Sequence, residues 1–324
     1  MVTEQVTGKT TPGTMMALRA HERGGPEVLV YEEAPVPEPA RGEIRVAVHA
    51  AGITFAELTW PETWESNGVE RTPIIPSHEV AGVVAAIGTD VDGLTVGDSV
   101  FGLVPFNRNG AAAEFVVLPA VDVARKSASV PDVVAAAAVL PALTAWEALR
   151  EQAHLTSGQR ILIVGGTGAV GAFLTQFARG MGAEVTVTVT SASNEARAKS
   201  LGADHVAVVE RGAVPAGLAG FDVVIDGAGS DVPEWMYAAL RPDGQLIVLQ
   251  QPPSEELAAK YGVRTAFFVV TTSRDRLEEL DALLAAGDVE VAVAQTFDLP
   301  AGKAAYESGP LPKPAPGKTV IVIP

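Results

Sequence analysis

Three glycines in the middle of the chain, Gly166, Gly168 and Gly171, form the pattern G-x-G-x-x-G. Glycines at this spacing allow a tight turn, a close approach of backbone amides to a pyrophosphate, and close packing of a helix on the turn. The unpaired N–H groups at the start of that helix also favour bound phosphate. The pattern predicts a dinucleotide site, and the alternative is a strand-to-helix turn without a ligand. The expected cofactor contacts are Gly165, Gly166, Thr167, Gly168, Ala169 and Val170.

The residues that flank the glycines have the patterns of a strand and a helix. The apolar run from Ile161 to Val164 is short and β-branched, which is typical of a buried parallel strand. After the glycines, apolar residues recur at helical spacing as far as Met181, and Gly182 is expected to end the helix. Strand, glycine turn and helix therefore follow in the order that the motif requires.

The end of the next predicted strand, Glu184–Thr190, bears on which dinucleotide binds. NAD sites usually end this strand with an acidic residue that binds the ribose 2′-OH, but here the nearest acid, Glu195, lies beyond the loop. Polar and basic residues could instead bind a 2′-phosphate, so we expect NADP(H), with NAD(H) as the alternative. These residues are Thr190, Ser191, Ser193, Asn194 and Arg197. Ser193 could also cap the next helix.

Composition narrows the class of protein. The 324 residues are 48% apolar and 19% charged, which is typical of a soluble globular chain long enough for two domains. The net charge of −16 disfavours nucleic acid and anionic membranes as partners. The chain has no cysteine, which excludes disulfides, thiolate catalysis and cysteine-ligated zinc. We find no stretch as long as a membrane span and no signal peptide, and expect a cytoplasmic protein.

The pattern of predicted strands and helices changes along the chain. From Met16 to about Lys126, short apolar runs broken by Gly and Pro predict a barrel-like β domain. From Val130 to about Gly262, strands and helices alternate, which predicts an α/β domain with a doubly wound parallel sheet and a ligand at its carboxyl edge. Residues Arg274–Ala286 have the pattern of an amphipathic helix. Short strands return after Val289 and are expected to complete the β domain. The polar residues 1–15 predict a disordered tail.

Motifs along nearly the whole chain from Met16 resemble those of the medium-chain dehydrogenase/reductase superfamily, above all its zinc-independent quinone oxidoreductase (zeta-crystallin-like) branch. The resemblance implies a GroES-like β-barrel domain, residues 16–128 and 266–324, and a Rossmann domain, residues 129–265. It is carried by motifs that include PSHEVAGVVAAIG at 76–88, GDSVFGL at 97–103, LPALTAWEAL at 140–149, GGTGAVG at 165–171, FDVVIDGAG at 221–229 and PGKTVIVI at 316–323.

One departure from the superfamily concerns zinc. Thr54 stands where zinc alcohol dehydrogenases have a cysteine ligand, although His78 and Glu79 are kept. One histidine without a cysteine or a second histidine cannot build a three-ligand catalytic zinc site, so we expect no metal and a His78 hydrogen-bonded beside a strand. Without this Lewis acid, alcohol oxidation is disfavoured. The resemblance then implies reduction of a quinone or an activated C=C bond.

A second departure concerns the substrate pocket. The resemblance places Asn, Asp and Tyr in the segment where this chain has Thr54, Glu57 and Thr59. Trp60 and Trp64 follow without helical or strand period, which favours a pocket wall, with Thr59, for a planar substrate over a core stripe. Thr54 Oγ1 is the candidate donor to the enolate oxygen, with water or Glu57 as the proton source. Glu57 could instead be a buried ion-pair partner.

The resemblance also implies further cofactor contacts and an assembly. Thr144 would contact the nicotinamide end and Lys318 the phosphate of the adenine ribose. A homodimer would form through the strand Ala266–Val270. The remaining residues that would line the cofactor groove and ring are Asp226, Gly227, Gln250, Phe268 and Val269.

We therefore expect an NADPH-dependent, zinc-independent reductase of a quinone or an α,β-unsaturated carbonyl. One alternative is an enoyl reductase of thioester or polyketide intermediates, against which the scattered Lys and Arg weigh. Two others are an NADP-binding protein without redox turnover and a non-redox natural-product enzyme on the same fold.

Overall fold

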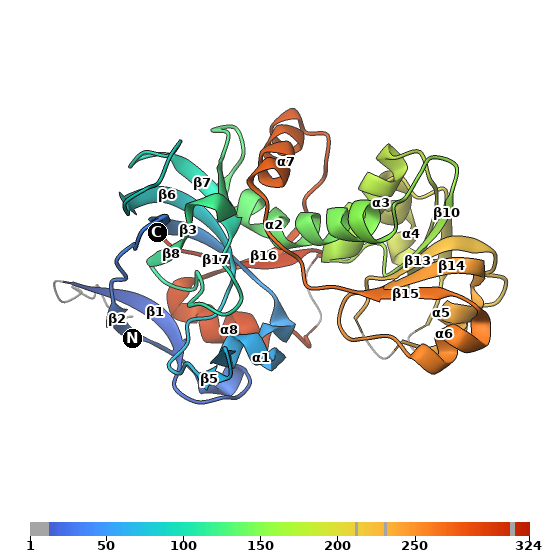
Figure 1. The fold of residues 1–324 in the computed structure, drawn as a ribbon, viewed down its shortest axis with the longest axis horizontal. Helices are drawn as coiled ribbons and strands as arrows, with labels where there is room; N and C mark the ends of the chain where they lie inside the picture. The colour runs from blue at the N-terminus through green and yellow to red at the C-terminus, as the bar shows by residue number, and fades with distance from the viewer. Residues whose placement is uncertain (1–12, 211–212, 230–231, 312–314) are drawn as a thin grey trace, which may run out of the picture. The chain divides into compact units, whose positions relative to one another are not determined.

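The computed structural model describes residues 13–210, 213–229, 232–311 and 315–324, and these form two compact units (Figure 1). The first unit holds the described residues up to 139 together with 273–285 and 293–324, and the second holds 140–272 and 286–292. The first boundary falls inside helix α2 (Asp132–Trp146), later than the predicted change after residue 128, because the helix runs on without a break. Most of the predicted tail lies outside the described residues, and strand β1 already begins at Thr14.

A seven-stranded sheet organises the first unit. Its order is β16-β17-β3-β6-β7-β9, with β8 also paired to β3. The C-terminal strand β17 pairs with β3, so the end of the chain completes a sheet begun near its start. The strands are β3 (Glu43–Ile53), β6 (Glu79–Ile87), β7 (Ser99–Leu103), β8 (Phe115–Pro119), β9 (Val123–Arg125), β16 (Val293–Asp298) and β17 (Lys318–Val322).

Smaller elements complete the first unit. Strand β1 (Thr14–Ala20) pairs with β2 (Leu29–Pro35), and β4 (Glu65–Ser66) pairs with β5 (Val69–Glu70). Three helices belong here, of which α7 has the bounds predicted from its amphipathic pattern. They are α1 (Pro61–Trp64), α7 (Arg274–Ala286) and α8 (Gly302–Glu307).

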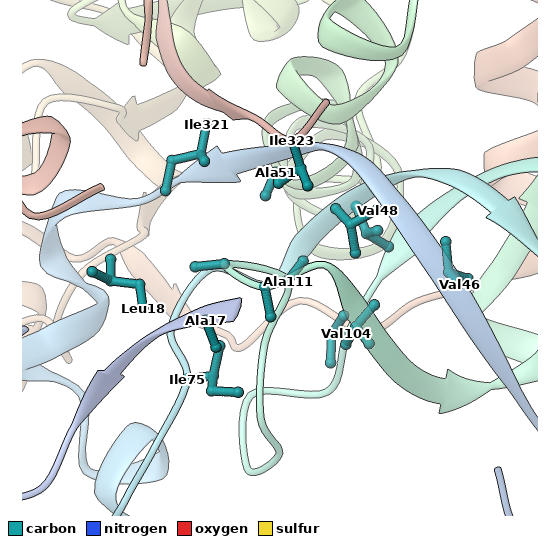
Figure 2. Packing of buried hydrophobic residues seen from close by; sticks show 14 of the residues in the cluster. Ala17, Leu18, Val46, Val48, Ala51, Ile75, Val104, Ala111, Ile321 and Ile323 are labelled. Atoms are coloured by element: carbon teal, nitrogen blue, oxygen red, sulfur yellow. The ribbon is translucent and has the colours of Figure 1, made fainter. Parts of the chain in front are cut away.

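The core of the first unit follows from alternation along β3. Every second residue from Ile44 is buried, as expected for a strand with one face in the core. Figure 2 shows side chains converging from β1, from β3, from the C-terminal strand and from the loops that carry Ile75, Val104 and Ala111. Trp64 belongs to this core cluster.

A six-stranded parallel sheet forms the second unit, in the order β12-β11-β10-β13-β14-β15. This is the predicted doubly wound sheet, so the predicted fold class is confirmed. Figure 1 shows α3 and α4 on one face of the sheet and α5 and α6 on the other. The elements are β10 (Arg160–Val164), α3 (Ala169–Gly180), β11 (Glu184–Val189), α4 (Glu195–Ser200), β12 (His205–Val208), β13 (Phe221–Asp226), α5 (Glu234–Ala238), β14 (Leu240–Val248), α6 (Glu255–Tyr261) and β15 (Arg264–Phe267).

Two elements of the second unit differ from the prediction. Helix α6 was not predicted, although Ser254 caps its start and the left-handed Gly262 ends it. Because Gly262 ends helix α6, the last strand can start directly after it, at Arg264. The edge strand is Arg264–Phe267 rather than Ala266–Val270, and it pairs with β14.

The helical run Asp132–Gln152 combines α2 with the π-helical turn Glu147–Gln152. At 21 residues it is long and apolar enough to cross a membrane by length and composition. The sequence prediction that no stretch reaches this length was therefore wrong, because Asp132 and Glu147 bracket the apolar run and make it look shorter. Inside the protein, 72% of the apolar window is buried, as in the core helices of globular proteins.

The packing of Trp64 predicts a stability effect. Trp64 is 1% exposed, and its indole N–H donates to the carbonyl of Leu58 at 2.9 Å. We expect Trp64→Ala to lower the free energy of unfolding by about 3–5 kcal/mol, because it leaves a cavity and an unpaired carbonyl. Urea denaturation of this variant beside Trp60→Ala, at a half-buried tryptophan of the same segment, measures the difference. Equal losses would contradict the core assignment of Trp64.

Candidate functional site

The predicted cofactor residues of the second unit follow the carboxyl ends of its parallel strands. In the sheet register, Val164 lies opposite Thr188 and Asp226, and Val248 lies opposite Asp226 and Phe267. The ends of β11, β10, β13, β14 and β15 are thus aligned at one edge. The segments that leave this edge begin at Gly165, Thr190, Gly227, Leu249 and Phe268. Ligands of doubly wound sheets bind at this edge, where the strand order reverses between β10 and β13.

The glycine turn between β10 and α3 is held by close backbone contacts. Gly165 has φ +77°, a left-handed conformation that favours glycine. A Cβ on Gly166 would lie 2.5 Å from Val187 of β11, and one on Gly171 would lie 2.1 Å from the carbonyl oxygen of Gly165. The sequence assigned the tight turn to Gly166, but that role falls to Gly165, and Gly166 is required for packing against β11.

The start of α3 is open to an anion. Gly168 is the N-cap residue, and no described side chain caps the helix. A Cβ at Gly168 would meet only the carbonyl oxygen of Gly165, at 3.3 Å. The first N–H groups of a helix have no partner within the helix, so here they remain for a ligand. This cradle fits a pyrophosphate.

The loop after β11 offers hydroxyl groups to a 2′-phosphate. Thr190, Ser191 and Ser193 are exposed. Ser193 does not cap the next helix, α4, whose N-cap residue is Asn194. Ser191 caps the short 3₁₀ turn before it, because its Oγ accepts the N–H of Ser193 at 3.3 Å. Arg197 differs from its predicted role, since its guanidinium lies 2.5 Å from Glu290 Oε1 and its charge is balanced within the unit. A phosphate would therefore compete with Glu290 for this cation.

The loops after β13 and β14 adjoin each other. Asp226 is fully buried and accepts the backbone N–H groups of Ala228 at 3.0 Å and Gly229 at 3.3 Å. The N–H of Gly227 donates to the carbonyl of Val164, which ties this loop to the glycine turn. A Cβ on Gly229 would lie 2.7 Å from the side chain of Gln250. Asp226 thus shapes the groove through the backbone.

Four predicted residues are placed more loosely. Thr144 is half-buried within α2, and Asn194 is half-buried at the end of its loop. Phe268 and Val269 follow β15 in an irregular segment, where Val269 is exposed.

In the first unit, Thr54 lies in a buried charged cluster. Lys318 Nζ is 2.5 Å from Glu79 Oε1 and donates to Thr54 Oγ1 at 2.8 Å. Both charged side chains are buried, that of Lys318 being 8% exposed. Lys318 was expected at the phosphate of the cofactor. The structure instead commits its ammonium group to Glu79 and to Thr54, the residue expected at the reacting end of the substrate.

Glu57 is the centre of a second buried group. Its Oε1 accepts the hydroxyl of Tyr306 at 2.5 Å, and its Oε2 accepts the backbone N–H of Ser77 at 2.9 Å. Ser77 has φ +70° and donates its own hydroxyl to the carbonyl of Gly52 at 2.8 Å. Sequence analysis missed Ser77 and Tyr306, since no spacing links Tyr306 to Glu57. It left Glu57 open between a proton source and a buried partner, and the geometry favours the buried partner.

Burial governs the protonation of this second group. It raises the pKa of Glu57 to about 7, and the hydrogen bonds from Tyr306 and Ser77 oppose the rise only in part. Burial, followed by the charge of Arg71, lowers the pKa of His78 to about 3. His78 Nε2 lies 3.7 Å from Glu57 Oε2, and neither ring nitrogen hydrogen-bonds to a described residue. The predicted hydrogen-bonded histidine is therefore a neutral ring packed edge-on against Phe106.

The predicted pocket wall fits only in part. Trp60 is half-buried and packs edge-on against Phe106, with ring centroids 5.2 Å apart. Thr59 is exposed and donates its hydroxyl to the carbonyl of Ala56 at 2.7 Å. Trp64 does not fit, because the core of the unit surrounds it. A wall would consist of Trp60 and Phe106 rather than of two tryptophans.

The donors near Thr54 do not suit a metal ion. Among the residues that the structure describes, no group of three His, Asp or Glu side chains could hold one. The ammonium group of Lys318 already supplies positive charge between Thr54 and Glu79.

Comparisons with known proteins agree with this architecture. The alcohol dehydrogenase GroES-like domain matches residues 40–130, and the zinc-binding dehydrogenase family matches residues 169–276. The quinone oxidoreductase of Salmonella typhimurium is 30% identical over 316 residues, a similarity that covers 89% of this chain and 93% of that protein. The chain belongs to the medium-chain dehydrogenase/reductase superfamily, in its quinone oxidoreductase-like branch.

Other members of the superfamily widen the comparison. The 2-haloacrylate reductase of a Burkholderia species is 28% identical, covering 90% of this chain and 95% of the relative. A mitochondrial NAD(P)H oxidoreductase of Danio rerio is 33% identical over 62% of this chain, but only 57% of that protein is spanned. A mycobacterial protein solved in complex with NADPH has a TM-score of 0.81 and 26% identity, covering 95% of this chain and 99% of the other. This protein is accordingly an oxidoreductase that binds a nicotinamide cofactor.

Because α3 packs closely on the glycine turn, we expect a side chain at Gly171 to lower the affinity for the cofactor. In Gly171→Ala, the new Cβ would overlap the carbonyl oxygen of Gly165 and push the start of α3 away from the turn. We expect the Kd for the dinucleotide to rise at least about tenfold, or about 1.4 kcal/mol, in a fluorescence titration. Gly180→Ala is the matched control, because it lies at the end of the same helix with nothing within 4 Å of a Cβ. Similar affinities for the two variants would contradict the cradle.

The raised pKa of Glu57 predicts a pH-dependent stability. Because its pKa of about 7 exceeds the usual 4.5, the protonated form stabilises the fold fully below about pH 4.5, and this contribution is lost as the pH rises through 7. We expect the free energy of unfolding of wild type, relative to Glu57→Gln, to fall by about 3 kcal/mol between pH 4.5 and 8 in urea denaturation. His78 is present in both proteins, so its opposite contribution cancels. Glu62→Gln, at an exposed position nearby, is the control, and a flat difference for Glu57→Gln would refute the assignment.

Proposed function

We propose that this protein is an NADPH-dependent, zinc-independent reductase that transfers hydride to a quinone or an α,β-unsaturated carbonyl compound. The observation that carries the proposal is the uncapped start of α3 behind a glycine turn whose contacts exclude larger residues. Bound NADPH would supply the hydride, and the protein supplies binding, orientation and charge stabilisation. The relatives named for quinone and 2-haloacrylate reduction support an acceptor with a conjugated double bond.

The preference for NADPH rests on the loop after β11. No acidic residue ends this strand, and the exposed Thr190, Ser191 and Ser193 can donate hydrogen bonds to a 2′-phosphate. The neighbour solved with NADPH supports the same choice. The ion pair of Arg197 with Glu290 reduces the expected margin over NADH, because Glu290 already balances part of the charge that a phosphate would share, although Nε and Nη2 of Arg197 have no hydrogen-bond partner among the described residues.

The proposed reaction needs a donor to the carbonyl oxygen of the acceptor. Negative charge grows on that oxygen as hydride adds to the β-carbon, and a preorganised hydrogen bond stabilises it. We assign this donor to Thr54 Oγ1, which is half-buried and held in place by Lys318. Water is the proposed source of the final proton. Glu57 is a poor source, because its carboxylate accepts the backbone N–H of Thr54, at 3.4 Å, rather than the Thr54 hydroxyl.

We also propose a cytoplasmic homodimer formed along β15. This strand lies at the edge of the sheet, and Phe267 and Val269 are 39% and 57% exposed. Exposed strand edges with apolar side chains pair readily unless they are protected. Sedimentation of wild type beside Phe267→Lys would test this assembly, and a monomeric wild type would refute it.

A paired nucleotide titration tests the proposed function. We expect NADPH to bind more tightly than NADH, and the absorbance of the reduced nicotinamide to fall only when a quinone or enone is added. Binding without oxidation over a broad acceptor panel would point to a protein without redox turnover. Product mass separates a reductase, whose product carries two added hydrogens, from a non-redox enzyme.

Thr54→Val tests the proposed donor. We expect kcat to fall about 100-fold, the size of effect found when one oxyanion donor is removed, while the Kd for NADPH is unchanged. Thr95→Val, in an exposed loop, controls for the loss of a threonine hydroxyl. Unchanged kcat in Thr54→Val would sink the assignment.

A further inference from the structure

We propose that Lys318 is a positioning residue for the reaction: its ammonium group orients the Thr54 hydroxyl toward the substrate and stabilises the charge that develops on that oxygen. This inference rests on the proposed function, because it assigns the group that acts behind the Thr54 donor. It replaces the phosphate-binding role that the sequence suggested for Lys318.

Three neighbouring strands bring the participants together. In the sheet order β17-β3-β6, Thr319 lies opposite Ile53 and Gly52 lies opposite Glu79. Lys318 therefore begins β17 beside the end of β3, where Thr54 follows. Glu79 begins β6 on the other side of β3. Backbone pairing, rather than a mobile loop, sets the positions of all three residues.

The side chains then fix the direction of each hydrogen bond. An ammonium group only donates, so Lys318 Nζ occupies a lone pair of Thr54 Oγ1 at 2.8 Å. The hydroxyl hydrogen of Thr54 must point elsewhere, and Glu79 Oε1, at 3.4 Å, is a long acceptor for it. Since Glu79 already lies 2.5 Å from Lys318, it competes weakly for that hydrogen. A carbonyl oxygen of the substrate would be the better acceptor.

The buried setting makes this arrangement effective. The side chains of Lys318 and Glu79 are 8% and 1% exposed, so the attraction of the ammonium group for a developing negative charge is little screened by water. As hydride adds to the β-carbon, the π electrons move to the carbonyl oxygen and are stabilised by the Thr54 hydroxyl. Lys318 keeps its proton throughout, and a water proton completes the product at the α-carbon, so hydride and proton account for the two added hydrogens.

Glu57 does not take this role. Its carboxylate oxygens accept the hydroxyl of Tyr306 and the backbone N–H groups of Ser77 and Thr54, whereas its contact with the Thr54 side chain is made by its own backbone N–H. Among the described residues, the charged groups within hydrogen-bond distance of Thr54 Oγ1 are Lys318 and Glu79. Of these two, only Lys318 is a cation.

A double-mutant cycle on the full-length protein tests the inference, with NADPH and the best acceptor of the panel. We expect Lys318→Met to lower kcat at least about tenfold without changing the Kd for NADPH, and Lys318→Arg to restore part of the loss. We expect Thr54→Val and Lys318→Met together to cost no more than Thr54→Val alone, because Lys318 acts through Thr54. A purely structural lysine would give losses that multiply.

A second variant separates a loss of the role of Lys318 from a loss of the fold. Lys318→Met leaves the buried Glu79 without the ammonium group that balances its charge, so Glu79→Gln with Lys318→Met removes both charges together. We expect this pair to keep the wild-type melting temperature within a few degrees and to show the same lowered kcat. Normal kcat in the pair, with Thr54→Val impaired, would overturn the role of Lys318 alone. Wild type that oxidises no NADPH with any acceptor would overturn the proposed function and this inference together.

Discussion

A buried ion pair between Lys318 and Glu79 constrains the first unit. Removing two charges from water costs several kcal/mol for each ion, and the cost is offset only when geometry and further hydrogen bonds are favourable. Here the strand order β17-β3-β6 supplies that geometry through backbone pairing. The position of Thr54 follows from the same pairing, because it is the residue that directly leaves the central strand of the three. Stability and the chemistry assigned to Thr54 thus depend on one contact.

The second unit is governed by close backbone approach. The left-handed Gly165 and the contacts of Gly166 and Gly171 leave no room for side chains between β10, β11 and α3. This compactness brings the open helix start to the edge where the parallel strands end. The first unit fixes the charged pair beside Thr54, and the second fixes a helix start that can bind phosphate. A hydride-transfer enzyme has to combine these two requirements.

How much of the fold and of the site could be predicted from the sequence depends on how far apart in sequence the interacting residues are. The glycine motif, the parallel sheet and the bounds of α7 follow from local spacing and periodicity, and the structure agrees with them. Trp64 and Lys318 were misassigned, because burial depends on partners distant in sequence. Nothing near Trp64 shows that a core closes around it. The contact of Tyr306 with Glu57 joins residues 249 positions apart and has no local signal. Arg197 was read as free for phosphate because Glu290, 93 residues away, was not foreseen as its partner.

The pairing of β17 with β3 has a consequence for how the chain folds during synthesis. Lys318 and Thr54 are 264 residues apart, and the whole second unit is translated between them. The second unit can therefore fold on the ribosome while the first still lacks its last strands. Folding of the intervening unit shortens the loop that must close, and so lowers the entropy lost when β17 finds β3. The first unit, whose synthesis begins first, is therefore expected to complete its folding last.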